Sequence, residues 1–314
     1  MFMLMLRVSR PYYYLVTLWL YLLPTGGHSE LITHAPFWLG LVYCTMPLNL
    51  MCYLMNDVSD VKVDKFNARK GGALLGAKES ADTLNGLASA TLLLQLPFLL
   101  VFGALCGLQR ILLWFAAVFA VNWAYNFGPR FSAYYAPLDL VCPCGYILVV
   151  LLSCWLNGVP YPPARSWVHA AFLVVRTQLW IQTFDIEPDA SAGRRNTAVL
   201  LGLCGSQLAL LLLLLAENAF AHASFGHSWP LRSFSLGSLA LLLLQALAQG
   251  SGRARAHEKG DDDARSGGGT ASVVAIASGS SSSLSPASVN AVFLLLGLGG
   301  VGLMARVWAD AAFL

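Results

Sequence analysis

The segment 35–64, APFWLGLVYCTMPLNLMCYLMNDVSDVKVD, carries a long apolar run directly into a cluster of carboxylates. Residues 35–55 contain no charged side chain, and the run is long enough to form a helix that crosses a membrane. Asp57, Asp60 and Asp64 follow with i, i+3 and i+7 spacing, so on a helix they lie on one face. The segment therefore predicts a membrane-spanning helix whose end presents an acidic face.

The three carboxylates of this acidic face repel one another unless a cation neutralises them. A hard divalent ion with oxygen ligands suits such a cluster, and protein-bound Mg²⁺ is commonly completed by phosphate oxygens of a substrate. Asn56 adds an amide oxygen to the candidate ligands Asp57, Asp60 and Asp64. The motif therefore indicates a magnesium site, which Mn²⁺ would also fit. A solvated acidic helix end is the simpler alternative.

The composition of the chain is that of a membrane protein. Hydrophobic residues make up 57% and charged residues 11%, whereas soluble domains carry about 25% charged residues. The formal net charge of +3 is too small to indicate a nucleic-acid partner. We therefore predict an all-α, polytopic helical bundle with about nine transmembrane helices, forming one domain over 1–314. The apolar segments are 11–24, 36–56, 84–106, 111–127, 137–156, 167–185, 198–217, 231–249 and 289–308.

A second acidic cluster, DIEPD at 185–189, stands where another apolar segment ends. Gln178, Gln182 and Asp185 are spaced i, i+4 and i+7, so a polar stripe leads into the cluster along one helix face. We expect Pro188 to end the helix, which leaves the first carboxylate in its last turn and the second in the loop. Polar contacts between neighbouring helices are an alternative role for the two glutamines.

The basic residues predict the orientation of the bundle. If the polar loop 57–83 faces the cytoplasm or an equivalent compartment, alternating spans place most of the 19 Lys and Arg residues on that side, in agreement with the positive-inside rule. Both acidic clusters and Arg130 then face the same side. The Gly-, Ser- and charge-rich segment 250–288 has few large apolar residues, so we expect a disordered loop there.

Two acidic clusters that face one cavity indicate a pair of divalent cations holding a diphosphate between them. Ionisation of an allylic diphosphate requires cations that stabilise the departing pyrophosphate, and an apolar bundle interior would house the isoprenoid tail and exclude water. The candidate catalytic and metal-binding carboxylates are Asp57, Asp60, Asp64, Asp185 and Asp189. The basic residues that would balance the remaining phosphate charge are Lys65, Arg69, Lys70, Arg130, Arg194 and Arg195.

The chain resembles the UbiA superfamily of intramembrane prenyltransferases in three places. The stretch 56–64 matches the Asn-Asp-x-x-Asp-x-x-x-Asp motif of the family, and the Asp-x-x-x-Asp at 185–189 matches its second motif. The stretch 125–131, YNFGPRF, resembles the turn that the family places between them. The resemblance implies a multi-pass enzyme in the lipid membrane that transfers a prenyl group from a prenyl diphosphate to an aromatic or other hydrophobic acceptor, with magnesium bound through the diphosphate. It also makes Asn56 and Tyr125 candidate diphosphate-binding residues.

The stretch 67–72, NARKGG, differs from the Arg-Pro continuation of the first motif in many quinone-pathway members. It is similar to the continuation in carotenoid elongases of the same family. A carotenoid elongase or a terpene cyclase is therefore the alternative to an enzyme with an aromatic acceptor. A transporter is less favoured, because transporters bind substrate near the bilayer midplane, whereas these carboxylates lie at span ends. A non-catalytic scaffold is less favoured, because every acidic motif residue is present.

Overall fold

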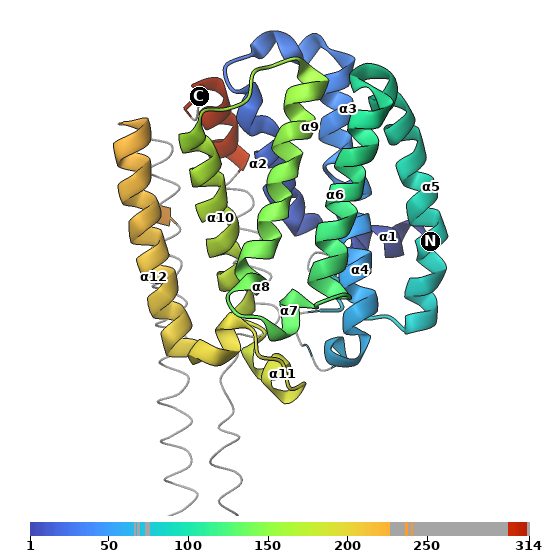
Figure 1. Cartoon of the computed structure of the whole chain (residues 1–314), viewed down its shortest axis with the longest axis vertical. Coiled ribbons are helices and arrows are strands. Elements are labelled where there is room, and N and C mark those ends of the chain that lie inside the picture. Colours follow the sequence, from blue (N-terminus) through green and yellow to red (C-terminus); the bar gives the residue numbers. More distant parts are fainter. Residues whose placement is uncertain are drawn as a thin grey trace, which may run out of the picture.

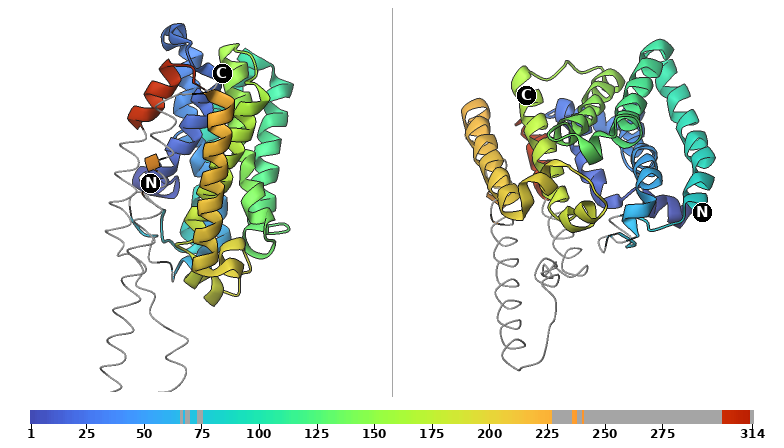
Figure 2. Two further views of the ribbon diagram at one scale, coloured as in Figure 1. Left: turned by 90° about the vertical axis from the view of Figure 1, so that its left-hand side faces the viewer. Right: turned by 60° about the horizontal axis from the view of Figure 1, so that its bottom comes forward.

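The computed structural model describes residues 1–65, 67, 70–72, 76–226, 236–237, 240 and 301–312. All regular structure in these ranges is helical, which confirms the predicted all-α class. Figures 1 and 2 show the long helices side by side along the long axis of the molecule. The α-helices are α1 (Phe2–Val8), α2 (Tyr14–Leu22), α3 (Ala35–Tyr43), α4 (Met46–Asp64), α5 (Ala81–Cys106), α6 (Leu108–Asn126), α7 (Phe131–Tyr134), α8 (Leu138–Val141), α9 (Leu148–Asn157), α10 (Ala164–Gln182), α11 (Ile186–Ser191) and α12 (Thr197–Phe225).

Five helical stretches among the described residues are long and apolar enough to cross a membrane. Their outward faces carry large exposed hydrophobic side chains, such as Leu93 and Leu100 on α5 and Leu212 on α12. Such faces suit contact with lipid, and the protein is an integral membrane protein. The five stretches are Ala35–Asp64, Ala81–Cys106, Leu108–Tyr134, Leu138–Asn157 and Thr197–Phe225.

The first seven predicted spans each coincide with helical structure. The other two, 231–249 and 289–308, lie mostly outside the described residues, and the predicted disordered loop 250–288 lies wholly outside them. The total of nine transmembrane helices therefore stays a prediction. The seventh span is longer than predicted, because α12 continues from 217 to Phe225.

The predicted span 36–56 is not one continuous helix. The chain breaks between α3 and α4 at Cys44 and Thr45, and Pro47 lies in the first turn of α4, where its missing N–H costs nothing. Asn49 Nδ2 donates hydrogen bonds to both carbonyl oxygens at the break, at 3.0 and 2.8 Å. These bonds matter because an unsatisfied carbonyl within a membrane is costly.

The ends of α4 and α10 bring the two acidic segments to one end of the bundle. α4 continues past the predicted span end at 56 to Asp64, so the first motif is helical throughout. Figure 1 shows α11 at the same end of the molecule as the C-terminal end of α4, while the connection between α9 and α10 lies at the opposite end. The fold therefore places both motifs on one side.

A buried ion pair joins α10 to α12 within the bundle. Arg176 Nε lies 2.5 Å from Glu217 Oε2, and both side chains are shielded from solvent. Charged residues inside a membrane bundle are costly unless they are paired. The pair therefore links α10 and α12, the two helices that flank the second acidic segment. It lies within the helices and not in the acidic segment itself.

Candidate functional site

A cavity of about 160 Å³ extends along α4 and is bounded by α6, α10 and the 3-10 helix η4 (Cys142–Ile147). The residues of α4 that line it change from Leu48 and Cys52 in the first half of the helix to Asp60 and Asp64 at its end. The cavity therefore has an acidic end and a remainder that is mostly apolar but includes polar side chains such as Asn122 and Gln178. The aliphatic wall residues are Val16, Leu48, Val63, Val118, Val121, Val149, Val174 and Ile181.

Asp57, Asp60 and Asp64 lie on one face of α4, as their spacing predicted, and they are only 1%, 5% and 7% exposed. Lys70, which the sequence analysis placed among the phosphate-binding candidates, contacts two of them. Its Nζ lies 2.8 Å from Asp57 Oδ1 and 2.5 Å from Asp64 Oδ2. Carboxylates this deeply buried are costly without such cationic partners.

Arg10 belongs to the site although the sequence analysis used it only for topology. Its Nη2 donates to Asn56 Oδ1 at 2.7 Å and also to Asp57 Oδ1. Its guanidinium lies 4.4 Å from the ring centroid of Tyr53, within the range of a cation–π interaction. Arg10 is therefore a fixed, buried counter-charge for the first motif. Only its positive charge at the start of an apolar segment could have drawn attention to it.

The second acidic segment folds differently from the prediction. α10 ends at Gln182, and Pro188 does not terminate it. Instead Pro188 lies in the first turn of a new short helix, α11, because proline is tolerated there. Asp185 is the N-cap residue of α11 and Asp189 lies inside the helix, so the predicted placements in a last turn and in a loop are wrong. Both carboxylates still line the cavity.

Two asparagines that the sequence analysis did not select hold the second motif. Asn67 Nδ2 donates to Asp185 Oδ1 at 2.9 Å, and Asn196 Nδ2 donates to Asp189 Oδ2 at 2.7 Å. Burial raises the pKa of Asp189 to about 6, and the nearby charge of Arg194 opposes the rise. At neutral pH this carboxyl is therefore still mostly ionised and able to bind a cation.

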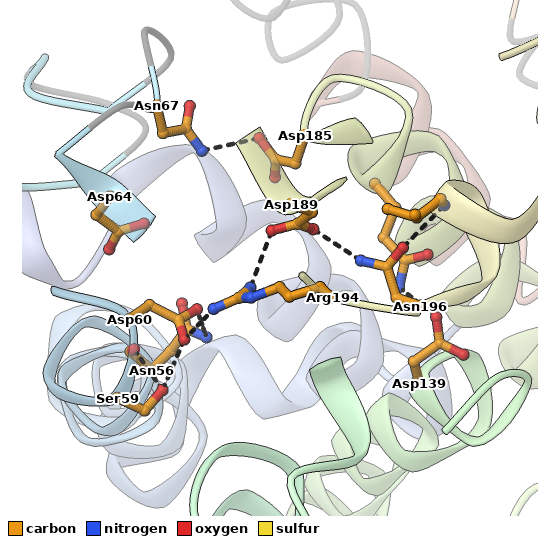
Figure 3. A network of polar contacts seen from close by, with 12 residues as sticks. Asn56, Ser59, Asp60, Asp64, Asn67, Asp139, Asp185, Asp189, Arg194 and Asn196 are labelled. Atoms are coloured by element: carbon orange, nitrogen blue, oxygen red, sulfur yellow. Dashed lines mark hydrogen bonds and ion pairs between the residues drawn. The ribbon is translucent and has the colours of Figure 1, made fainter. Parts of the chain in front are cut away.

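Arg194 joins the two motifs directly (Figure 3). Its Nη2 donates to Asp60 Oδ1 of α4, and its Nη1 lies 3.1 Å from Asp189 Oδ1 of α11. Burial alone would lower the pKa of Arg194, but the attraction of the two carboxylates raises it, so the side chain remains charged. One guanidinium thus connects carboxylates that lie far apart in the sequence.

Arg130 also reaches the first motif. Its Nη2 donates to the carbonyl oxygen of Ser59 at 2.9 Å and to Asp60 Oδ1 at 3.2 Å. Tyr125 lines the cavity, but its hydroxyl accepts a hydrogen bond from Gln178 Nε2 at 2.7 Å and joins α6 to α10. The interhelical role considered for the glutamines therefore applies to Gln178.

The remaining basic candidates lie outside this cluster. Lys65 is exposed at the C-terminal end of α4, and Arg195 is exposed beside Arg194. Neither side chain is among the described residues that line the cavity. Both side chains are exposed to solvent, so the structure does not bring them to the cavity. Arg69 lies outside the described residues.

The donor set of the cavity end fits a hard divalent cation. Its candidate ligands are all oxygen atoms, the type that Mg²⁺ prefers. Asp57 Oδ2 is buried and accepts no hydrogen bond from the part of the chain that the structure describes. In that same part, no three His, Cys, Asp or Glu side chains converge closely enough to hold an ion by themselves. Mg²⁺ held by one or two carboxylates is commonly completed by water and by phosphate oxygens.

Solved structures with the same fold come from Archaeoglobus fulgidus. A UbiA homologue bound to GPP and Mg²⁺ superimposes with a TM-score of 0.63, and the structure bound to DMAPP and Mg²⁺ gives 0.64. The sequence identity is 18% in both cases, and the alignments cover 98% and 99% of this chain and 99% of each homologue chain. The likeness extends over the whole bundle.

The relatives in sequence are lycopene elongase/hydratases. The protein of Haloarcula japonica is 30% identical over 210 residues, which is 63% of this chain and 67% of that protein. The chain belongs to the UbiA superfamily. The lycopene elongase/hydratase of Corynebacterium glutamicum is 28% identical, and the match spans 57% of this UbiA protein and 63% of the relative. A scan against protein-family models gave no match.

Membership confirms the predicted fold class and the predicted class of enzyme. This UbiA protein is a prenyltransferase of the membrane. The superfamily relation does not assign a role to any single side chain of this chain, so the roles of the acidic and basic residues follow below as proposals.

Proposed function

We propose that this protein transfers an isoprenoid group from a magnesium-bound prenyl diphosphate to a polyene hydrocarbon of the lycopene class. The meeting of two acidic motifs at one end of a largely apolar cavity carries the proposal. A prenyl diphosphate needs both a charged site for its diphosphate headgroup and an apolar site for its hydrocarbon tail. The Archaeoglobus homologue was solved bound to GPP or DMAPP together with Mg²⁺, which supports the donor and the metal.

The acidic end would hold the headgroup between oppositely charged partners. When bound, Mg²⁺ would neutralise the charge that develops on the departing diphosphate. Lys70, Arg130 and Arg194 carry donors at the same place and would share their hydrogen bonds between carboxylates and phosphate oxygens. The residues that would hold the metal are Asn56, Asp57, Asp60, Asp64, Asp185 and Asp189.

The largely apolar remainder of the cavity would control the fate of the prenyl group. As the bond between the first carbon and its oxygen breaks, pyrophosphate takes the electron pair and the prenyl carbon becomes cationic. Side chains such as Val121, Val149 and Val174 exclude water from this carbon. A double bond of the acceptor then attacks this carbon, and the cationic adduct loses a proton to an oxygen of the released pyrophosphate.

The choice of acceptor rests on the relatives and on one stretch of sequence. Both relatives described above are lycopene elongase/hydratases. The stretch 67–72 is also similar to the continuation of the first motif in carotenoid elongases. A polyene of this class is therefore proposed ahead of an aromatic acceptor.

The acceptor is tested with purified protein in detergent, Mg²⁺ and labelled dimethylallyl or geranyl diphosphate. Parallel reactions contain lycopene, 4-hydroxybenzoate or no acceptor. We expect label in a longer polyene only in the reaction with lycopene. Label in the aromatic product would contradict the proposed acceptor. A labelled cyclic product formed without acceptor would show that the protein is a terpene cyclase and not a transferase.

Arg130→Gln is expected to lower kcat/KM for the prenyl diphosphate by about tenfold, because a charge-assisted hydrogen bond to phosphate is lost. Arg130→Lys should retain most of the activity. Arg110→Gln is the matched control, since Arg110 is exposed in the first turn of α6, whereas Arg130 follows the other end of this helix. Steady-state kinetics of Arg130→Gln that equal those of the wild type would remove Arg130 from the phosphate site.

We also propose that the bundle crosses the membrane nine times with both acidic motifs on one side. In a cysteine-free background, cysteines at Lys65 and Arg195 are expected to react with an impermeant maleimide from the same side of sealed vesicles. Cysteines at Gln109 and Tyr161 should react from the other side. All four positions are exposed. Labelling of residues 65 and 195 from opposite sides would refute this topology.

A further inference from the structure

Asp139 is a fully buried carboxylate that neither acidic motif includes. It lies in α8, and its exposure is 0%. Its Oδ2 accepts hydrogen bonds from Gln182 Nε2 at 2.9 Å and from the backbone N–H of Thr197 at 2.7 Å. Its Oδ1 accepts from Thr197 Oγ1 at 2.7 Å. Figure 3 shows Asp139 next to Asn196, the residue that donates to Asp189.

The partners of Asp139 stand at the two ends of the second acidic segment. Gln182 is the last residue of α10, three residues before Asp185. Thr197 is the first residue of α12, three residues after Arg194. The Asp139 carboxylate therefore fixes both Gln182 and Thr197, the two residues that flank the segment with Asp185, Asp189 and Arg194.

The position of Thr197 in turn determines where the neighbouring residues Asn196 and Arg194 meet the carboxylates at the acidic end of the cavity. Asn196, next to Thr197, caps α12 through Val199 N–H and donates to Asp189 Oδ2 at 2.7 Å. Arg194 reaches from the same loop to Asp60 and Asp189. A shift of the start of α12 would move both groups away from their partners.

We propose that Asp139 is a positioning residue, which sets the geometry of Asp189 and Arg194 for the magnesium diphosphate without touching it. The three hydrogen bonds come from neutral donors, so a carboxylate that accepts all of them is needed at this place. Groups that hydrogen-bond metal ligands directly, as Asn196 does, change metal affinity by about 10–100-fold when they are removed, and Asp139 fixes the start of the helix that Asn196 caps. The inference rests on the proposed function.

Asp139→Asn is the test, because an amide has the same shape but cannot accept on both sides. We expect the Mg²⁺ concentration for half-maximal activity to rise by about tenfold or more. KM for geranyl diphosphate should rise with it, while KM for the acceptor stays unchanged. Thr197→Val removes one of the three hydrogen bonds and should give a smaller shift in the same direction.

Glu217→Gln is the matched control, because it also replaces a buried acid by its amide between α10 and α12. It should lower the melting temperature without changing the Mg²⁺ requirement. If Asp139→Asn does not fold, Thr197→Val decides. Wild-type Mg²⁺ dependence in the folded variants would overturn the inference. A wild-type protein that does not bind geranyl diphosphate with Mg²⁺ would instead refute the proposed function.

Discussion

Asp57→Ala and Asp185→Ala are each expected to lower kcat/KM for the prenyl diphosphate by about 100-fold or more. The two residues belong to different motifs. Asp185 lines the cavity, and Asp57 contacts Arg10 and Lys70, which line it. Preorganised charges at a leaving group typically contribute on the order of 100–1,000-fold in rate. Loss of either motif should therefore remove most of the turnover, and EDTA should do the same to the wild type.

The control for this experiment is Asp82→Ala, since Asp82 is an exposed carboxylate in the first turn of α5. Truncation of Asp57 removes a partner of both Arg10 and Lys70, so folding must be checked. Asp57→Asn keeps the acceptor oxygen for these cations and loses only the charge. Full turnover of Asp57→Asn and Asp185→Ala would show that these carboxylates take no part in the reaction.

Arg194→Gln is expected to have the second largest effect, on the order of 100-fold in kcat/KM. The side chain makes charge-assisted contacts to Asp60 and Asp189, and hydrogen bonds to charged groups contribute about 1.5–3 kcal/mol each. Its loss would leave buried carboxylates facing each other and would weaken diphosphate binding. The measurement is steady-state kinetics at saturating acceptor.

The neighbouring residue provides a control within the same loop. Arg195→Gln changes the same net charge, but Arg195 is exposed and its described hydrogen bond uses the backbone N–H, to Ala133 O at 2.7 Å. It should therefore leave the kinetics within about twofold of the wild type. Equal effects of the two substitutions would indicate that the loop acts through its overall charge rather than through the bridge at Arg194.

The first motif could be predicted from the sequence because its geometry is local. The spacing of Asp57, Asp60 and Asp64 fixes a shared face as soon as the segment is helical. The second motif was harder, since Pro188 is compatible both with the end of one helix and with the first turn of the next. The local sequence did not decide between them, and the structure has the second arrangement.

The groups that complete the site could not be predicted, because their partners lie far away in the chain. Arg10 is 46 residues from Asn56, and Asn67 is 118 residues from Asp185. Such pairs depend on how the helices pack, which periodicity does not determine. Asp139 was missed although it lies inside the predicted apolar segment 137–156, where a carboxylate usually faces the interior of the bundle.

The central claim is that both acidic motifs hold one magnesium diphosphate. The most direct test is isothermal titration of the purified wild type, Asp57→Ala and Asp185→Ala with geranyl diphosphate, in Mg²⁺ and in EDTA. We predict binding by the wild type only in Mg²⁺, and loss of this binding in both variants. Mg²⁺-dependent binding of wild-type affinity in either folded variant would contradict the claim, because one motif alone would then suffice.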